Sequence, residues 1–372
     1  MPGRIVLYGA TGYTGELTAR ALVDRGAKPV LAGRSGVKLR RLADALGGDL
    51  ETATADVADP FSVRSLVEAD DVLITTVGPF ARYGEAALEA AVEAGATYID
   101  STGEPAFIRR VFEEWAAPAR RFGATLLTAM GYDWVPGNLA GALALTEAGE
   151  AATKVRTAYF TTGPFGPSGG TRASAAGALI EPGYAYRGGR IVTERGAKRV
   201  REFYAAGKRR QAISAAASEH FTLPASFPRL TDVDAYLGWF GSRSKAMSAG
   251  SAAMSGLFKV PGAKAGAGAL IGRFVKGSTG GPSAEQRAKS GSYIVGEALD
   301  AAGDVLASVD LAGADGYDFT AGMLAWAAIT AAETPIEAKG AVGPVEAYGI
   351  ERLEEGAADA GIARRDRDRT PA

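Results

Sequence analysis

Short apolar runs alternate with helically spaced apolar positions over the first third of the chain. An apolar run at residues 4–8 ends in a glycine-rich turn, after which Leu17, Ala21 and Leu22 recur at helical spacing. Further strands are expected at residues 28–32, 51–55, 71–77, 97–100 and 125–130, and helices at 37–46, 60–67, 84–94 and 105–122. Strands that alternate with helices at this spacing predict an α/β fold built on a Rossmann-type, doubly wound parallel sheet.

The alternation ends after Gly131, where a different pattern begins. The elements expected from there on are strands at residues 154–162, 290–299 and 305–312, a turn at 302–304, and helices at 171–180 and 317–332. Strands and helices without regular alternation indicate an α+β second domain.

Two later segments are interpreted from their composition. Residues 236–285 are rich in Ala, Gly and Ser, with apolar residues such as Met247 and Phe274 between them. The plain interpretation is a set of small-residue helices that pack on one another; a lid, a homodimer contact and an apolar substrate tunnel are the alternatives. The charged, proline-containing end from Ile362 onward predicts a frayed terminus.

The composition narrows the classes of function. Lys and Arg number 41 against 42 Asp and Glu, a net charge of -1, so charge offers no argument for binding nucleic acid or an anionic membrane. The lack of cysteine excludes disulfides and thiolate chemistry, and a single histidine, His220, argues against a metal site. Residues 1–8 show a strand pattern rather than a signal peptide, and no apolar run approaches the roughly 20 residues of a membrane span. We therefore expect a cytoplasmic protein with no metal, nucleic-acid partner or transmembrane segment.

The glycine-rich turn has the spacing and the place of a dinucleotide site. Gly9, Gly12 and Gly15 lie between a strand and a helix, where they permit a tight turn, close approach to a pyrophosphate and close helix packing. We expect the pyrophosphate to be bound by Gly9, Thr11, Gly12, Tyr13, Thr14 and Gly15.

The end of the second strand indicates which dinucleotide binds. NAD sites tend to have a carboxylate there, whereas this chain has Arg34 and Ser35, with Lys38 one turn later. An arginine attracts the 2′-phosphate that a carboxylate would repel, so we expect NADP(H). A solvated surface arginine is the alternative. Asp56, after the third strand, has the position of an adenine-binding residue, although a plain loop aspartate explains it nearly as well.

Two further strands end in polar or rigid loops at the same edge of the sheet. Val77, Gly78, Pro79 and Phe80 should pass under the nicotinamide ribose, because ligands bind beyond the carboxyl ends of such strands. The next strand ends in the cluster at 100–104, which is either part of the site or a helix start with Glu104 in a capping box.

No acid or base is singled out by a motif. Tyr204 and Lys208 have short-chain dehydrogenase spacing, but they lie far from the first domain, and a basic helix face explains them better. Tyr132 and Asp133, at the end of a strand where the domains should meet, are the preferred catalytic candidates; interdomain hydrogen bonding is the alternative. Arg172 is a third candidate, for binding a substrate carboxylate or carbonyl.

Several motifs in one order resemble the saccharopine dehydrogenase-like reductases, and within them the trans-acting enoyl reductases. They are GATGYTG, AGR, VGPF, YIDSTGE and GYDWVPGNLAG, followed by SGGTRAS, GYDFTAGMLAWAA and GPVEAYGIERLEEGAADAGI. The resemblance implies an NADP-binding Rossmann domain at 1–134 plus about 338–365, an inserted α+β substrate or oligomerisation domain at 135–337, and a tail at 366–372. The chain looks shorter than many of that branch, and Trp134 and Gly137-Asn138 depart from its usual pattern.

Three hypotheses for function follow. The first is an NADPH-dependent reductase of a polarised C=C bond in an apolar lipid, polyketide or other specialised metabolite. The second is a C=N reductase of the saccharopine dehydrogenase type, for which Arg172, Arg187 and Arg190 offer no clear clamp on amino-acid carboxylates. The third is a regulator that senses NADP(H) without turnover. The fold cannot choose among them, because function resides in the site.

Overall fold

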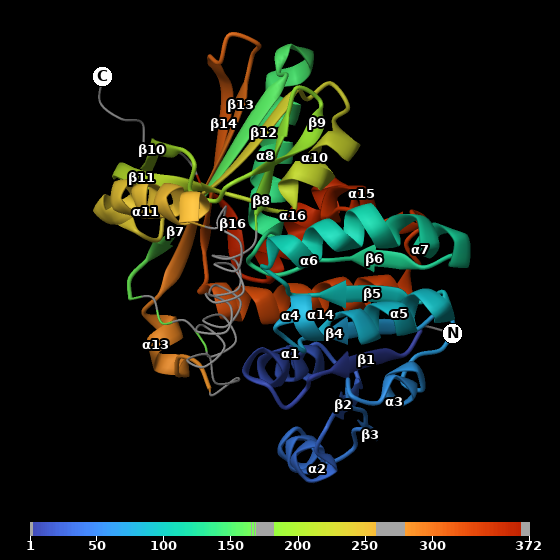
Figure 1. Cartoon of the computed structure of the whole chain (residues 1–372). Helices are drawn as coiled ribbons and strands as arrows, with labels where there is room; N and C mark the ends of the chain where they lie inside the picture. Colours follow the sequence, from blue (N-terminus) through green and yellow to red (C-terminus); the bar gives the residue numbers. More distant parts are fainter. Residues whose placement is uncertain (1–2, 165, 167, 169–181, 258–279, 366–372) are drawn as a thin grey trace.

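The first sheet has the strand order of a Rossmann fold. The computed structural model describes residues 3–164, 166, 168, 182–257 and 280–365. Parallel pairing runs in the order β15-β6-β5-β4-β1-β2-β3, which contains the doubly wound order 3-2-1-4-5-6 (Figure 1). The strands are β1 (Ile5–Tyr8), β2 (Val30–Gly33), β3 (Thr52–Thr54), β4 (Val72–Thr75), β5 (Thr97–Asp100), β6 (Thr125–Leu127) and β15 (Gly340–Ala341). The predicted α/β class is confirmed.

Helices cover both faces of this sheet, which is why its central strands are apolar throughout. Leu7 of β1 packs with Leu22 on one face, and Val6 packs with Leu88 on the other. The helices are α1 (Tyr13–Asp24), α2 (Gly36–Ala45), α3 (Pro60–Arg64), α4 (Phe80–Tyr83), α5 (Glu85–Ala94), α6 (Pro105–Arg110), the π-helical η1 (Val111–Trp115) and α7 (Ala116–Phe122). The helix expected at 105–122 is thus one helical stretch with a π segment inside it.

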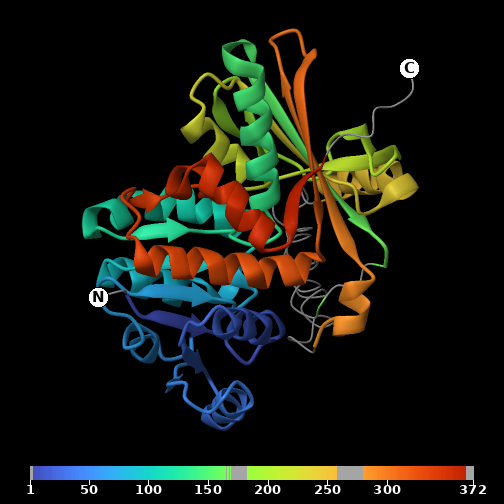
Figure 2. The ribbon, with the colours of Figure 1, turned by 180° about the vertical axis from the view of Figure 1, so that it is seen from behind.

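A helix from late in the chain completes one of these layers. α14 (Gly316–Glu333) packs against α1 and lies over β4 and β5, as the view from behind shows (Figure 2). Phe319 and Met323 are fully buried in the same core as β1. A helix that is apolar all round is stable only when it is buried in this way.

The second sheet is mixed and larger, with nine strands among the described residues. Its order is β10-β11-β12-β7-β13-β14-β16, with β8 and β9 attached beside β12. The strands are β7 (Lys154–Thr162), β8 (Gly183–Arg187), β9 (Arg190–Glu194), β10 (Val200–Ala205), β11 (Lys208–Ala215), β12 (Asp232–Leu237), β13 (Gly291–Leu299), β14 (Val305–Gly313) and β16 (Ile362–Arg365). The three long strands expected after Gly131 are therefore β7, β13 and β14.

The helix α8 (Val135–Ala148) joins the two sheets and packs on β7, β13 and β14. Gly296 of β13 permits this contact, since a Cβ there would lie 2.3 Å from the carbonyl oxygen of Ala140. The remaining helices are η2 (Gly149–Ala151), α10 (Glu219–Ser226), η3 (Gly241–Arg243), α11 (Ser244–Leu257), α13 (Ala284–Ala288), α15 (Pro344–Tyr348) and α16 (Ile350–Asp359). No helix in the described part of the chain is both long and apolar enough to cross a bilayer.

Two local expectations are wrong. Tyr204 and Lys208 lie on the two strands of the β10–β11 hairpin and not on a helix, because Ala206 and Gly207, both at positive φ, reverse the chain between them. Ile362–Arg365 is not frayed, because it pairs with β14 as an edge strand of the second sheet.

The domain limits and the homodimer remain predictions. The segment at 338–365 contributes β15 to the first sheet and β16 to the second, so it contacts both parts of the molecule. The helix expected at 171–180 and residues 258–279 of the small-residue segment lie outside the described residues.

Candidate dinucleotide-binding and catalytic site

The glycine turn brings the end of β1 and the start of α1 into very close contact. Gly9 has a φ of +90°, and its carbonyl oxygen accepts the N–H of Gly12 at 2.9 Å. A Cβ on Gly15 would lie 2.2 Å from that same oxygen. The backbone at these positions therefore excludes other side chains, as close packing of helix on strand requires.

The N-terminus of α1 is open to an anion. Gly12 is its N-cap residue and has no side chain with which to accept a hydrogen bond. The N–H groups of Tyr13, Thr14 and Gly15 in the first turn therefore stay available, and the helix dipole favours negative charge there. This geometry fits the pyrophosphate of a dinucleotide.

Arg34 lies just beyond β2 with an exposed side chain. It forms no hydrogen bond or ion pair with another residue in the described part of the chain. Ser35 is the N-cap of α2, and its side-chain oxygen accepts the N–H of Lys38 at 3.4 Å. The guanidinium and the hydroxyl proton thus remain available to a 2′-phosphate, and exposed Lys38 adds positive charge.

Asp56 has a local structural role. Its Oδ1 accepts the N–H of Ala58 at 3.0 Å and so closes the turn after β3. Burial and the nearby Asp56 carboxylate raise the pKa of Tyr8 to about 12. The turn explains Asp56 without a ligand, and its adenine-binding role stays a prediction.

The loops that follow β4 and β5 are joined by Glu104. Its Oε1 accepts the N–H of Phe80 at 2.8 Å, and its Oε2 accepts the N–H of Ala81 at 2.9 Å. The capping-box interpretation is therefore wrong, because the carboxylate binds the start of α4 rather than its own helix. Thr102 instead accepts the N–H of Glu104 at 3.1 Å. These bonds hold residues 77–80 in place at the carboxyl edge of the sheet.

Asp100 holds the loop after β6 in place through hydrogen bonds to its carboxylate. Its carboxylate accepts the N–H groups of Thr102 and Ala129 and the hydroxyl of Thr128, at 2.8 to 2.9 Å. Burial raises the pKa of Asp100 to about 6, although these hydrogen bonds oppose the rise. The network positions the segment that continues to Asp133.

Tyr132 and Asp133 lie where this segment leaves the first sheet. The backbone N–H of Tyr132 donates to Thr320 Oγ1 of α14 at 3.0 Å, and its ring packs edge-on against Tyr159 of β7. Tyr132 therefore connects the first sheet to the second. Burial raises its pKa well above the ordinary range.

The Asp133 carboxylate lies against Gly103, near Tyr132 and Glu219. Its Oδ2 packs on Gly103, where a Cβ would lie only 2.8 Å away. Its Oδ1 is buried and has no hydrogen-bond partner among the described residues. Burial raises the pKa of Asp133 to about 7, so at neutral pH this carboxyl is able to hold or release a proton.

Comparison with known proteins shows which family the first part of the chain resembles. Residues 5–129 match the family model described as the saccharopine dehydrogenase NADP binding domain. Over these residues the chain is similar to the NADP-binding domain of saccharopine dehydrogenases. The match to an NADP-binding domain confirms the predicted cofactor, NADP(H).

Curated relatives match over about a third of the chain. A Mycobacterium tuberculosis protein provisionally named trans-acting enoyl reductase is 41% identical over 140 residues, 36% of this chain and 33% of its own. The trans-acting enoyl reductase of Mycobacterium ulcerans is 39% identical over 140 residues, 36% of this chain and 34% of its own. The match thus spans about a third of the length of these relatives.

A solved structure is similar over the whole chain. The saccharopine dehydrogenase (L-Glu forming) of Saccharomyces cerevisiae superposes with a TM-score of 0.61 at 11% identity, over 98% of this chain and 99% of its own. At this identity the likeness concerns the fold, and it extends the shared architecture beyond the NADP-binding domain to the second sheet.

The glycine turn of the NADP-binding domain also contacts the later part of the chain. The Tyr13 hydroxyl donates to the carbonyl of Pro282 at 2.6 Å and accepts from Arg287 Nη1 at 3.0 Å. The Tyr13 ring lies edge-on to Tyr317, with 5.2 Å between centroids. Residues around α13 therefore lie directly against the expected pyrophosphate site.

A buried carboxyl on the second-domain side was not predicted. Glu219 of α10 is fully buried, and its Oε1 accepts the hydroxyl of Tyr159 at 2.8 Å and that of Thr157 at 3.2 Å. Burial, reinforced by the charge of Asp133, raises the pKa of Glu219 to about 8. Nothing in the local sequence marks Glu219, because its burial depends on contacts with β7.

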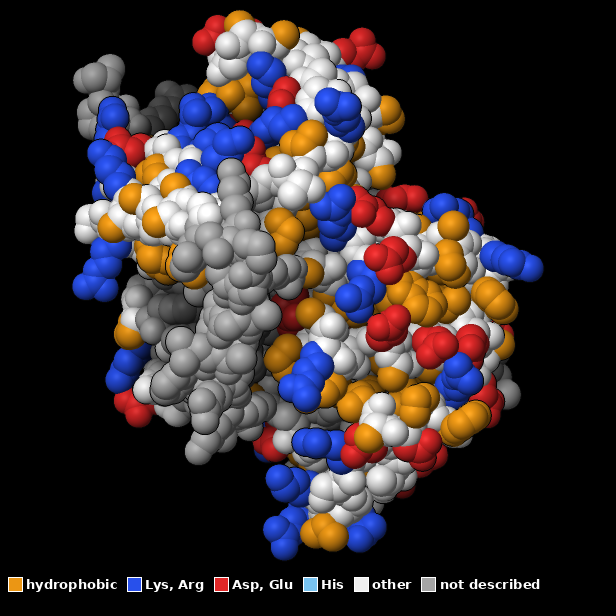
Figure 3. Space-filling view, viewed as in Figure 1, with side chains coloured by type: hydrophobic (Ala, Val, Ile, Leu, Met, Phe, Trp, Pro, Cys, Tyr) orange, Lys and Arg blue, Asp and Glu red, His pale blue; other side chains and the backbone are white. Residues whose placement is uncertain are grey.

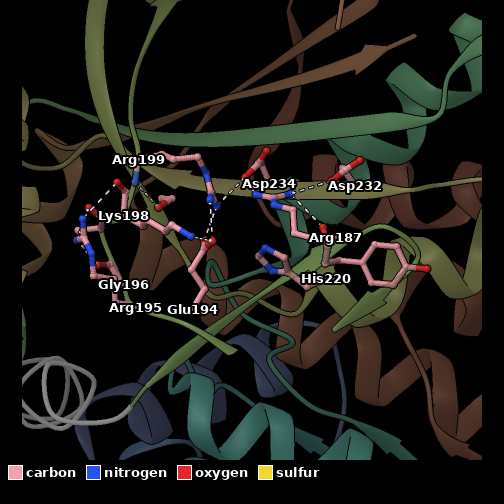
Figure 4. A network of polar contacts seen from close by, with 12 residues as sticks. Arg187, Glu194, Arg195, Gly196, Lys198, Arg199, His220, Asp232 and Asp234 are labelled. Carbon is pink, nitrogen blue, oxygen red and sulfur yellow. Dashed lines mark hydrogen bonds and ion pairs between the residues drawn. The ribbon is translucent and has the colours of Figure 1, made fainter. Parts of the chain in front are cut away.

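Arg187 of β8 and Arg190 of β9 belong to the second sheet, and His220 follows Glu219 on α10. Figure 4 shows Arg187 pointing to Asp234 and Asp232, with His220 beside them. Arg187 pairs with Asp234 and lies 3.8 Å from Asp232, so it is not free to clamp a substrate carboxylate. Burial lowers the pKa of His220 to about 4 and keeps it neutral. Arg190 is exposed at the hairpin turn, and Arg172 lies outside the described residues.

Proposed function

We propose that this protein is an NADPH-dependent oxidoreductase that reduces a C=C bond conjugated to a carbonyl group. The observation that carries the proposal is the Asp133 carboxyl, with its unpartnered oxygen and a pKa of about 7, at the carboxyl edge of an NADP-binding domain. A proton donor at that edge is what reduction of a polarised double bond needs besides a hydride. The names of the curated relatives agree with this chemistry.

The cofactor would be held by the residues of the first domain. Gly9, Thr11, Gly12, Tyr13, Thr14 and Gly15 would bind the pyrophosphate, Arg34, Ser35 and Lys38 the 2′-phosphate, and Val77, Gly78, Pro79 and Phe80 the nicotinamide ribose, with Asp56 near the adenine. The open N-terminus of α1 and the free guanidinium of Arg34 are the structural features that fit these groups. Bound NADPH would supply the hydride.

The chain's own residues would supply orientation and the proton. Glu104 and Asp100 hold the loops at the reacting edge through backbone hydrogen bonds. Hydride addition at the β-carbon moves the C=C electron pair to the carbonyl oxygen, and the α-carbon then takes a proton. The protonated Asp133 carboxyl would donate that proton, with water as its source of replenishment. Tyr132 would line the reacting position beside it.

The substrate is proposed to be an apolar acyl or polyketide-like molecule. This rests on the apolar residues of the 236–285 segment, of which only part is described. The C=N alternative has less support, since Arg187 is already paired with two aspartates.

The test is NADPH oxidation with matched acceptors. We expect turnover with enoyl thioesters or enones and none with cyclic imines that carry amino-acid carboxylates. Turnover of the imines alone would contradict the proposed reaction. Tight NADPH binding with no hydride transfer to any acceptor would favour the sensor hypothesis instead.

A further inference from the structure

Tyr159 of β7 contacts both chain neighbours of Asp133. Its ring lies edge-on to the Tyr132 ring, with 5.7 Å between centroids, and edge-on to the Trp134 ring, at 5.3 Å. Its hydroxyl lies 3.0 Å from the carbonyl oxygen of Trp134, which accepts its proton. Because one side chain holds the residues before and after Asp133, the backbone that carries the Asp133 carboxyl has little freedom to move.

The Tyr159 hydroxyl is itself fixed at the start of α8. The N–H of Gly137, in the first turn of α8, donates to it at 2.8 Å, and Glu219 Oε1 lies 2.8 Å away as a second acceptor of its proton. Gly137 leaves the room for both groups, since a Cβ there would lie 2.1 Å from the Tyr159 hydroxyl oxygen and 2.3 Å from Glu219 Oε1. The hydroxyl therefore joins β7, α8 and α10 at one point.

Glu219, which fixes this hydroxyl, is an acid without contact to water. Figure 3 shows Asp and Glu side chains at the surface among Lys and Arg, whereas Glu219 is 0% exposed. Its Oε1 also accepts the hydroxyl of Thr157 at 3.2 Å, on the same face of β7 as Tyr159.

The burial of Glu219 does not serve stability. Burial raises its pKa to about 8, and the groups that interact with its charge include Tyr159, Tyr184 of β8 and Asp133. At neutral pH the folded state must take up a proton to bury this carboxyl, which costs folding free energy. An acid that opposes folding and fixes one hydroxyl beside Asp133 points to a role in the site.

We propose that Tyr159 and Glu219 are positioning residues: Glu219 fixes the Tyr159 hydroxyl, and Tyr159 holds Asp133 at the reacting edge through its two chain neighbours. This rests on the proposed function, in which the Asp133 carboxyl donates its proton to the α-carbon. In this role neither residue touches the acceptor. Proton transfer depends steeply on where the donor lies, so loss of the hydroxyl should slow turnover without weakening the binding of NADPH or the acceptor.

The kinetic test uses the full chain with Tyr159→Phe, which keeps the ring and removes only the hydroxyl. With an enoyl thioester, kcat should fall about 10- to 100-fold, while KM and the affinity for NADPH stay within about twofold. The pH at which the wild-type rate falls, about 7, should move lower in the variant, because a loosened Asp133 is better hydrated. Tyr348→Phe is the matched control and should change neither, since its hydroxyl joins α15 to α14 through the carbonyl of Ala327, at 3.1 Å.

Two substitutions of Glu219 test the second residue. Glu219→Gln keeps an oxygen that accepts the Tyr159 hydroxyl and resembles the uncharged acid, so kcat at neutral pH should stay within about threefold of the wild type. Glu219→Leu removes the acceptor at similar volume and should lower kcat about tenfold. The double variant with Tyr159→Phe and Glu219→Leu should be no slower than Tyr159→Phe alone, because both changes act through the same hydroxyl.

A structural role alone predicts a different result. Loss of the bonds to Trp134 and Gly137 would then lower the thermal midpoint of Tyr159→Phe, as in Tyr348→Phe, with kcat and the pH profile unchanged, and that outcome would overturn the proposal. If Tyr159→Phe does not fold, the two Glu219 variants decide: equal kcat in Glu219→Gln and Glu219→Leu would overturn it.

A measurement without turnover separates this inference from the proposed reaction. In urea unfolding, the stability difference between the wild type and Asp133→Asn should grow with pH, because the folded Asp133 keeps its proton up to about pH 7. In the Tyr159→Phe background this growth should shrink to about half or less, since a loosened Asp133 gains water. If no acceptor is reduced but the growth shrinks, the reductase function fails and the positioning of Asp133 stands. Growth that is undiminished in Tyr159→Phe, or absent in the wild type, refutes the positioning.

Discussion

Substitution of Asp133 by asparagine tests the proton donor and its energetic cost together. The Asp133 side chain is held against Gly103 with one oxygen buried and unpartnered, and burial raises its pKa from an ordinary 3.8 to about 7. Asparagine has nearly the same shape but cannot ionise. The substitution therefore removes the buried charge and the transferable proton while leaving the packing in place.

The sign of the stability effect follows from proton linkage. The folded protein holds the Asp133 proton more tightly than the unfolded chain, so raising the pH above 3.8 costs folding free energy until the folded pKa of about 7 is passed. At about 1.4 kcal/mol per pH unit, a pKa of about 7 instead of 3.8 corresponds to a cost of about 4 kcal/mol above pH 7. Asp133→Asn should therefore gain stability relative to the wild type, and the gain should widen by about 3 kcal/mol between pH 5 and pH 8.5.

Activity should change in the opposite direction. Loss of a general acid lowers kcat/KM by about 100-fold or more, and the wild-type rate should fall as the pH rises through about 7. Urea unfolding at the two pH values and NADPH oxidation across the pH range measure both effects. Asp44→Asn, on an exposed position of α2, is the control and should alter neither. A stability gap that is the same at both pH values, or full activity of Asp133→Asn, would refute the reasoning.

Three further substitutions address the cofactor site and the second buried carboxyl. Arg34→Ala should weaken NADPH binding about 10- to 100-fold and leave NADH binding unchanged, because only NADPH has the 2′-phosphate; equal losses in calorimetry would contradict this. Gly15→Ala should abolish dinucleotide binding, since its Cβ would lie 2.2 Å from the carbonyl oxygen of Gly9; fluorescence titration that shows wild-type affinity would argue against the close contact. Glu219→Gln should stabilise the protein by an amount that grows as the pH rises from 4.5 to about 8 and then levels off, because burial raises the pKa of Glu219 from 4.5 to about 8 in the folded state; a gain that shrinks as the pH rises in urea unfolding would contradict this.

The parts of the fold that were predicted from sequence are those with a strong local pattern. The run at 4–8 and the glycines after it predicted β1, the turn and α1, because turn chemistry and alternation act within a few residues. The long strand at 154–162 agrees with β7 at both ends. The NADP preference rested on Arg34, a single residue at a position that the topology defines.

Other elements had no local signal. α8 is buried from Val135 to Leu145 on every side, so it lacks the amphipathic period by which helices are recognised. The basic residues around Tyr204 suggested a helix face, whereas pairing across the β10–β11 turn made them strands. β16 forms only because β14 offers an open edge.

The sequence by itself determined the order of strands and helices around the first sheet, the glycine turn between β1 and α1, and the choice of dinucleotide. Only the tertiary structure decided which polar groups lose their water. Asp133 and Glu219 are ordinary carboxylates in the sequence, and their pKa values rise because segments far apart in the chain bury them near each other. Desolvation is a property of the surroundings in space, and no local pattern of residues records it.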